Sequence, residues 1–81
     1  MEDQIIYYSP VICYEVIPHQ NSYSVDVYFQ GSKDSDDENL HSFLKDFSED
    51  KETTLNFVIS LSKNAALPLH VPELAEEFLS A

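Results

Sequence analysis

Four side chains in this protein could act as a nucleophile or a general base: Cys13, His19, His41 and His70. They fall in different segments, and none stands in a motif that places a base beside a nucleophile. Cys13 lies in an apolar run, which is typical of a cysteine that packs as a small hydrophobic side chain. Gly31 is the single glycine, which excludes a glycine-rich phosphate-binding loop. The sequence therefore predicts a protein that is not an enzyme.

One histidine has a candidate partner nearby in the sequence. His41 follows an acidic run, and Asp37 stands four residues before it. On a helix, residues four positions apart lie on the same face. We therefore expect a surface His–Asp pair with a structural role rather than a general base.

The acidic run 34–38 offers carboxylate oxygens, which are the ligands that calcium prefers in proteins. An EF-hand loop that began at Asp34 would need a glycine at its sixth position and a carboxylate at its twelfth. Asn39 and Lys45 stand at those positions. The sequence also lacks a Cys/His pair at the spacing of a zinc site. It therefore predicts neither a bound metal nor another cofactor.

The sequence is strongly acidic. Fifteen aspartates and glutamates against four lysines and no arginine give a formal net charge of −11. Affinity for phosphates comes from lysine and arginine, so direct binding to nucleic acid or to an anionic membrane is disfavoured. A partner with a basic surface, such as a nuclease or a nucleic-acid-binding complex, is favoured instead. The candidate contact residues are acids and one tyrosine: Asp26, Tyr28, Asp34, Asp36, Asp37, Glu38, Asp46, Glu49, Asp50, Glu52, Glu73, Glu76 and Glu77.

Two strands are expected to come first along the chain. Residues 5–17 are rich in β-branched and aromatic side chains, with Pro10 marking a bend or a sheet edge. Residues 22–30 alternate between apolar and polar side chains. One face of this second strand should be buried, and the other, with Asp26 and Tyr28, should face water. A polar turn joins the two strands as an antiparallel hairpin.

The acidic run is expected to start a helix. Ser35 and Glu38 fit the capping-box pattern, and acids in a first turn suit the positive end of the helix dipole. The apolar side chains that follow recur at helical spacing: Leu40, Phe43, Leu44 and Phe47. The sequence therefore predicts an amphipathic helix over residues 36–47.

Residues 53–62 fit two structures. Apolar side chains at every second position from Leu55 to Leu61 favour a third strand. Alternatively, Ser48 could cap a second helix that has acids in its first turn and Lys63 near its end. We prefer the strand.

A short C-terminal helix is expected to begin at Pro72, because proline suits the first helical position. Together these elements predict a single acidic α+β domain over residues 1–81. The helix between the second and third strands would make those strands parallel, in a mixed sheet with two helices on one face. The alternative architecture is a β-hairpin packed on three helices.

The N-terminal residues are acidic and lack the basic start of a signal peptide. No apolar run approaches the roughly 20 residues that span a bilayer. We therefore expect a cytoplasmic protein that makes no membrane contact.

Two functions fit these properties. The first is a small acidic protein-binding module, an inhibitor that occupies the basic, nucleic-acid-binding surface of a partner. Such an inhibitor could be a nucleic-acid mimic of phage or mobile-element origin, and the chain is similar in size and charge to anti-restriction and anti-CRISPR proteins. The alternative is a non-catalytic adaptor or structural subunit that binds through an apolar strand surface, with the charge serving solubility. A homodimer formed through an edge strand belongs to this second class.

Overall fold

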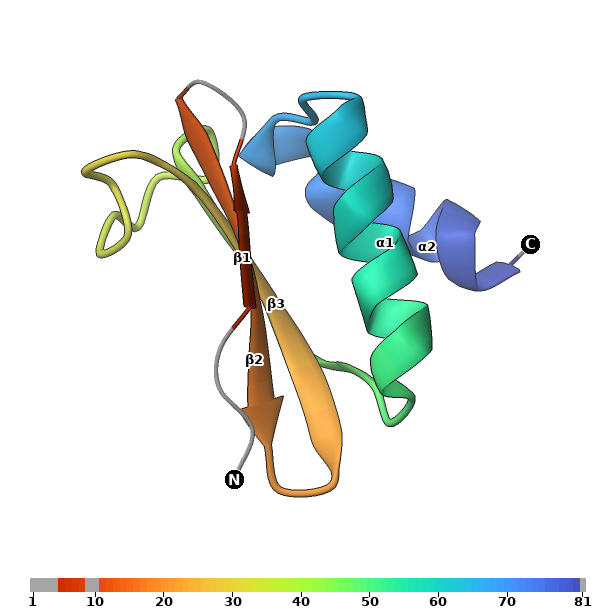
Figure 1. The fold of residues 1–81 in the computed structure, drawn as a ribbon. Helices are drawn as coiled ribbons and strands as arrows, with labels where there is room; N and C mark the ends of the chain where they lie inside the picture. Colours follow the sequence, from red (N-terminus) through yellow and green to blue (C-terminus); the bar gives the residue numbers. More distant parts are fainter. Residues whose placement is uncertain (1–4, 9–10, 81) are drawn as a thin grey trace.

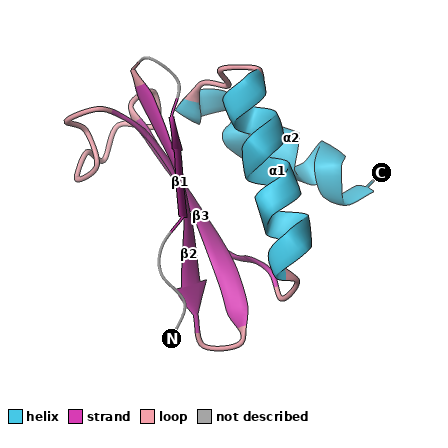
Figure 2. Cartoon of the chain, in the orientation of Figure 1, coloured by secondary structure: helices cyan, strands magenta, loops and turns pink. Residues whose placement is uncertain are grey.

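The computed structural model describes residues 5–8 and 11–80. Its strands are β1 (Ile5–Tyr8), β2 (Ile12–His19), β3 (Ser22–Phe29) and β4 (His41–Ser48). They form one antiparallel sheet in the order β1-β2-β3-β4, and helices α1 (Lys51–Lys63) and α2 (Val71–Ser80) pack on one face (Figure 1). The long loop between β3 and β4 lies on the other side of the sheet (Figure 2). The α+β class is therefore confirmed.

The predicted N-terminal hairpin is formed by β2 and β3, which pair along the whole length of both strands. In the tight turn between them, Gln20 has a left-handed φ of 55°. The single strand predicted over residues 5–17 is in fact two strands, because β1 and β2 pair antiparallel with each other. Pro10, where a bend was expected, lies outside the described residues.

The core lies between the sheet and the two helices. Tyr14, Val16, Val25 and Val27, at alternate positions of β2 and β3, are at most 1% exposed. The helices contribute the other large part of the buried cluster: Phe57, Val58, Leu61, Val71 and Ala75. The Tyr14 hydroxyl donates a 2.9 Å hydrogen bond to the Ala66 carbonyl, so the polar end of this buried ring has a partner.

Three phenylalanines join β4 to both helices. Phe47 stacks on Phe57 with their ring centroids 4.6 Å apart, and Phe57 contacts Phe78 at 5.1 Å. Aromatic pairs at such distances contribute stability beyond the burial of their area, so this cluster fixes the end of β4 against the helices.

The helix predicted over residues 36–47 is wrong, because residues 31–40 form a loop and β4 follows. The side chains that resemble a capping box close turns instead. Ser35 Oγ accepts a hydrogen bond from the Asp37 amide at 3.1 Å, and Asp37 Oδ1 accepts one from the Asn39 amide at 2.9 Å. Such local bonds compete with helical hydrogen bonds for the same backbone groups.

A bulge in β4 explains why its apolar residues have helical spacing. Leu44 pairs with Val25, and the register then shifts where Asp46 has a φ of 50°. Between the Val25–Leu44 and Tyr23–Ser48 pairs, β4 spans four positions where β3 spans two, so the strict alternation of faces is broken, and Leu44 and Phe47 both contact the core although they are three positions apart. The described strands all pair antiparallel and residues 53–62 form no strand, so the predicted parallel pairing of 22–30 with 53–62 and the mixed sheet are wrong as well.

The strand preferred for residues 53–62 is also wrong, because they lie in α1. The buried side chains of α1 have helical spacing: Thr54, Phe57, Val58 and Leu61. Thr54 hides this pattern in the sequence, because it is polar but fully buried, and its hydroxyl donates to the Asp50 carbonyl at 3.0 Å. The cap of α1 is Asp50 rather than Ser48, since the Asp50 side chain accepts a bond from the Thr53 amide.

The predicted C-terminal helix is confirmed as α2, with Pro72 in its first turn, after the short 3₁₀ helix η1 (Pro68–His70). Val71 and Ala75 anchor α2 in the core. Neither helix in the described part of the chain is long and apolar enough to cross a membrane.

The C-terminus of α1 closes in a Schellman motif with an alanine at the left-handed position. Ala65 has a φ of 47°, its amide donates to the Ser62 carbonyl at 3.2 Å, and the Ala66 amide donates to the Leu61 carbonyl at 3.0 Å. This position usually holds glycine, because a Cβ atom is unfavourable there.

We expect Ala65→Gly to raise the free energy of unfolding by about 0.5–1 kcal/mol, because it removes that steric cost. Urea denaturation measures the change. Ala66→Gly is the matched control: Ala66 has no positive φ, so glycine there should destabilise the protein. A destabilised Ala65→Gly variant would contradict the left-handed conformation.

Candidate functional site

Two acidic side chains lie buried on the face of the sheet away from the helices. Glu15 of β2 and Asp26 of β3 are directly opposite each other in the register. Their exposed fractions are 2% and 5%. Like charges opposite each other across two strands repel, and burying each one costs several kcal/mol unless cations compensate. The prediction that Asp26 lies on a solvated face is therefore wrong.

Lys33, in the loop between β3 and β4, supplies one of these cations. Its Nζ lies 3.0 Å from Glu15 Oε1 and 5.6 Å from the centroid of the Tyr28 ring. The hydrogen bond to Glu15 and the charge of that carboxylate raise the pKa of Lys33, although its side chain is half exposed. Gly31 allows the loop to turn back over the sheet, since it has a φ of 86°.

His41 supplies the second cation, at the first residue of β4. Its Nε2 lies 2.5 Å from Asp26 Oδ1, and its Nδ1 lies 3.0 Å from the Ser35 carbonyl oxygen. Both partners accept hydrogen bonds, so the doubly protonated imidazolium fits the site best. Burial opposes protonation, but the bonds to Ser35 and Asp26 outweigh it and raise the pKa of His41. The predicted His41–Asp37 surface pair is thus wrong, because its helix does not form.

Burial also perturbs two acids beside these cations. It raises the pKa of the Asp26 carboxyl, and the hydrogen bond and charge of His41 offset only part of that rise. Burial and the Glu15 carboxylate raise the pKa of the Tyr28 hydroxyl far above its usual value. Cys13, which pairs with Tyr28 in the register, is buried as well.

We call Glu15, Asp26, Lys33 and His41 the loop clamp, because they hold the β3–β4 loop on the sheet. Its two carboxylates are covered, so a substrate could reach them only if the loop moved away. The chemistry that the geometry supports is therefore charge pairing that responds to pH. Across the described residues, no group of three potential ligands could hold a metal ion.

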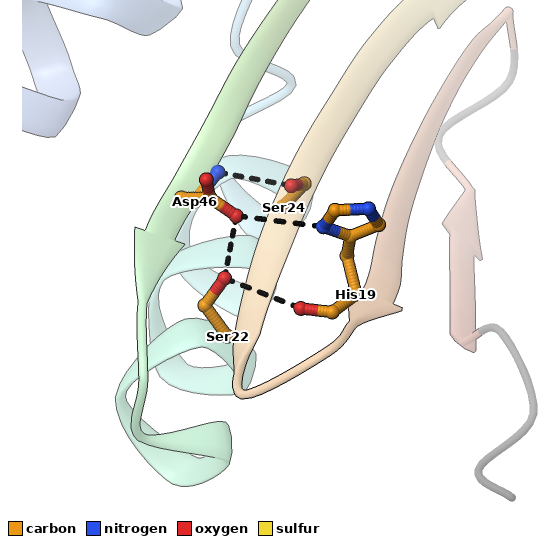
Figure 3. A network of polar contacts seen from close by, with 4 residues as sticks. All are labelled: His19, Ser22, Ser24 and Asp46. Carbon is orange, nitrogen blue, oxygen red and sulfur yellow. Dashed lines mark hydrogen bonds and ion pairs between the residues drawn. The ribbon is translucent and has the colours of Figure 1, made fainter.

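A second polar network lies at the other end of β4, around its bulge (Figure 3). The Ser22 hydroxyl donates to Asp46 Oδ1 at 2.5 Å, and the Asp46 amide donates to Ser24 Oγ at 2.9 Å. His19 Nδ1 lies 3.9 Å from the same Asp46 oxygen. Ser22 bonds to the carboxylate rather than to the imidazole, so the histidine does not activate it as a nucleophile. This network fixes the bulge beside the β2–β3 turn.

The predicted contact residues do not form one surface. Those at 34–38 precede β4, those at 46–52 begin near its end, and those at 73–77 lie on α2. The second group begins at Asp46, the sixth residue of β4, so the strand separates it from the first group by roughly 17 Å, at about 3.3 Å per residue.

Several of these acids have local structural roles. Asp26 belongs to the loop clamp, Asp37 closes a turn, Asp46 holds the bulge and Asp50 caps α1. Asp37, Asp46 and Asp50 are nevertheless exposed, and so are the eight remaining predicted acids: Asp34, Asp36, Glu38, Glu49, Glu52, Glu73, Glu76 and Glu77. Tyr28 is half-buried beneath Lys33.

No protein-family model, curated protein or solved structure matches this chain. Its function must therefore be inferred from the physical properties of the described surface and of the loop clamp.

The sequence-based reasoning missed Glu15 and Lys33 as members of a site. A signal for Glu15 was present, because a two-residue turn at residues 20–21 places Glu15 directly opposite Asp26. Lys33 and His41 gave no such signal, since their place depends on how the loop folds back over the sheet.

The pH dependence of stability follows from His41. Its pKa in the folded protein is raised above the unfolded value of 6.5, so the folded state binds this proton more tightly. The resulting stabilisation is complete below that value and is lost as the pH rises through the folded-state pKa. We expect the free energy of unfolding in urea to fall as the pH rises from about 6 through the raised folded-state pKa of His41, and His41→Gln to remove this component of the fall.

His70→Gln is the matched control, because His70 is exposed on η1. It should leave the wild-type pH dependence unchanged. Parallel curves for the wild type and His41→Gln would contradict the pairing of His41 with Asp26.

Proposed function

We propose that this chain is a small cytoplasmic binding module that uses its acidic surface to occupy a basic, nucleic-acid-binding surface of a partner protein and inhibit it. The observation that supports this most is that a cation of the acidic loop is paired within the molecule, whereas most of the acids are exposed. Lys33 stands within the acidic loop but is paired with Glu15. Eleven of the predicted acids are exposed, and they lie on the loop, from the end of β4 to the first turn of α1, and on α2.

The segments that carry five of the exposed acids are held by the rest of the structure. The loop clamp attaches the β3–β4 loop, with Asp36 and Glu38, to the sheet at two points. Glu73, Glu76 and Glu77 lie on α2, which the core anchors through Val71 and Ala75. Side chains on elements that are already ordered lose less conformational entropy on binding, which favours affinity.

The dimensions of the molecule are compatible with nucleic-acid mimicry. Its longest extent is 30 Å, and one turn of B-DNA is about 34 Å long. Carboxylates on one face of such a molecule could replace phosphates along up to one turn of a basic groove. The negative net charge would also speed the encounter with a basic partner.

Neutralising the acids of α2 tests this proposal. We expect the triple variant Glu73→Gln, Glu76→Gln, Glu77→Gln to lose about tenfold or more in affinity for a basic partner isolated from the host, because each substitution removes a charge. Glutamine and glutamate have similar helix propensities, so the variant should stay folded. Salt at about 0.5 M should weaken wild-type binding as well.

The partner must be a basic protein, and excess duplex DNA should compete for it with this chain. Capture that is insensitive both to the charge substitutions and to salt would contradict the proposal.

A second candidate function, an adaptor that binds through apolar surface, is favoured by one observation. Segment 65–72 leaves Leu67 and Leu69 exposed, and Phe43 is 50% exposed on β4. Binding through these side chains alone would be insensitive to moderate salt.

A further inference from the structure

β4 is one of the two outer strands of the sheet, and among the residues that the structure describes it pairs with β3 alone (Figure 3). The Phe29 amide donates to the Leu40 carbonyl at 3.0 Å, which shows which residues of β4 direct their backbone groups toward β3. In an antiparallel pair, alternate residues turn their backbone groups toward the partner strand, and the residues between them turn theirs away. Leu40 and Ser42 therefore face β3, whereas Phe43 and Lys45 present their backbone groups at the open edge.

This open edge is short. At its start, the His41 amide already donates to the Asp37 carbonyl at 3.0 Å. At its end, the bulge at Asp46 interrupts the regular register. The stretch that can accept another strand therefore runs from Ser42 to Lys45.

The Phe43 side chain lies between two hollows along this edge. The larger, of about 310 Å³, is lined in part by Glu38 and Leu69, and the smaller, of about 120 Å³, by Ile17 and Lys45. A strand added to the edge would point its side chains alternately to the two faces of the sheet. Its side chains could therefore enter both hollows, as in other complexes where a strand is added to a sheet edge.

Charge determines which kind of segment fits. A second copy of this chain would bring its own net charge of −11, and its own Glu38, to the same edge. Like charges oppose such a symmetric pairing. A basic segment is complementary instead, because a lysine or arginine on one face of it could approach Glu38 in the larger hollow, while an apolar side chain on its other face packs on Phe43 and Ile17 in the smaller one.

We propose that the open edge of β4 around Phe43 is the docking site for an extended segment of the partner that carries basic and apolar side chains and adds to the sheet as a fifth strand. This inference rests on the proposed function and names the place where the acidic module recognises its partner. The net charge of −11 draws a basic segment toward the molecule, Glu38 pairs with one of its cations, and the Phe43 backbone and side chain fix its register.

The probe is an eight-residue peptide of alternating lysine and valine, which matches the length of β4. Its control is the same peptide methylated at every amide nitrogen, which keeps charge and side chains but cannot donate to a strand edge. With saturating probe, hydrogen exchange at the Phe43 and Lys45 amides should slow by about tenfold or more, and the methylated peptide should leave it unchanged. Phe43→Thr, a substitution at an exposed strand position, should weaken probe binding by about tenfold.

Three results would overturn the docking site. The first is equal binding of both peptides with changes confined to the exposed acids. The second is a concentration-dependent dimer that Phe43→Thr disrupts, because a second copy would then occupy the edge. The third is unchanged capture of the basic host partner by Phe43→Thr while the triple glutamine variant of α2 loses it. That third result would leave the acidic-module proposal standing. If instead the triple variant still captured the partner while Phe43→Thr lost it, the acidic-module proposal would be removed.

Discussion

The burial of two opposed carboxylates, Glu15 and Asp26, is the constraint on which the second face of this sheet depends. Each carboxylate loses its water when it is buried, and the two repel each other across neighbouring strands. Lys33 and His41 compensate this cost, and both come from the segment that leaves β3 and returns as β4. The path of the loop and the start of β4 are therefore coupled to the charges beneath them.

The same constraint links folding to the surface that we propose to be functional. The Lys33 ammonium pairs with Glu15 on the sheet rather than with the acids of its own loop, and Asp36 and Glu38 remain exposed. When His41 pairs with Asp26, it fixes the first residue of the edge strand that carries Phe43. The loop clamp thus orders both the acids and the open edge before any partner binds. Such preorganisation lowers the entropic cost of association.

The sequence predicted the elements whose periodicity is uninterrupted. Residues 22–30 alternate without a break and form β3, and the apolar side chains after Pro72 form α2. The predictions for two segments in between were wrong for local reasons: a predicted helix is the strand β4, and a predicted strand is the helix α1. A bulge at Asp46 gave β4 the apolar spacing of a helix, and the buried Thr54 removed one position from the apparent apolar face of α1.

The candidate site was predictable only in part. The strand pairing that opposes Glu15 to Asp26 follows from a short turn, but the contacts of Lys33 and His41 need the tertiary path of the loop. The exposed acids of α2 were predicted correctly as surface residues. Residues 34–38 were predicted to begin a helix, and they lie in the loop instead, because Ser35 and Asp37 bond to the backbone two residues onward.

A double-mutant cycle between Lys33 and Glu15 measures the central interaction most directly. Lys33→Met should destabilise the protein by about 1–2 kcal/mol, less than for a fully buried pair, because half of the lysine side chain is exposed. In the Glu15→Gln background, where the carboxylate that Lys33 compensates is gone and Asp26 keeps His41 as its partner, the same substitution should cost far less. The predicted coupling free energy is about 1 kcal/mol. Equal costs in the two backgrounds would contradict the claim that the acidic loop is held on the sheet by this ion pair.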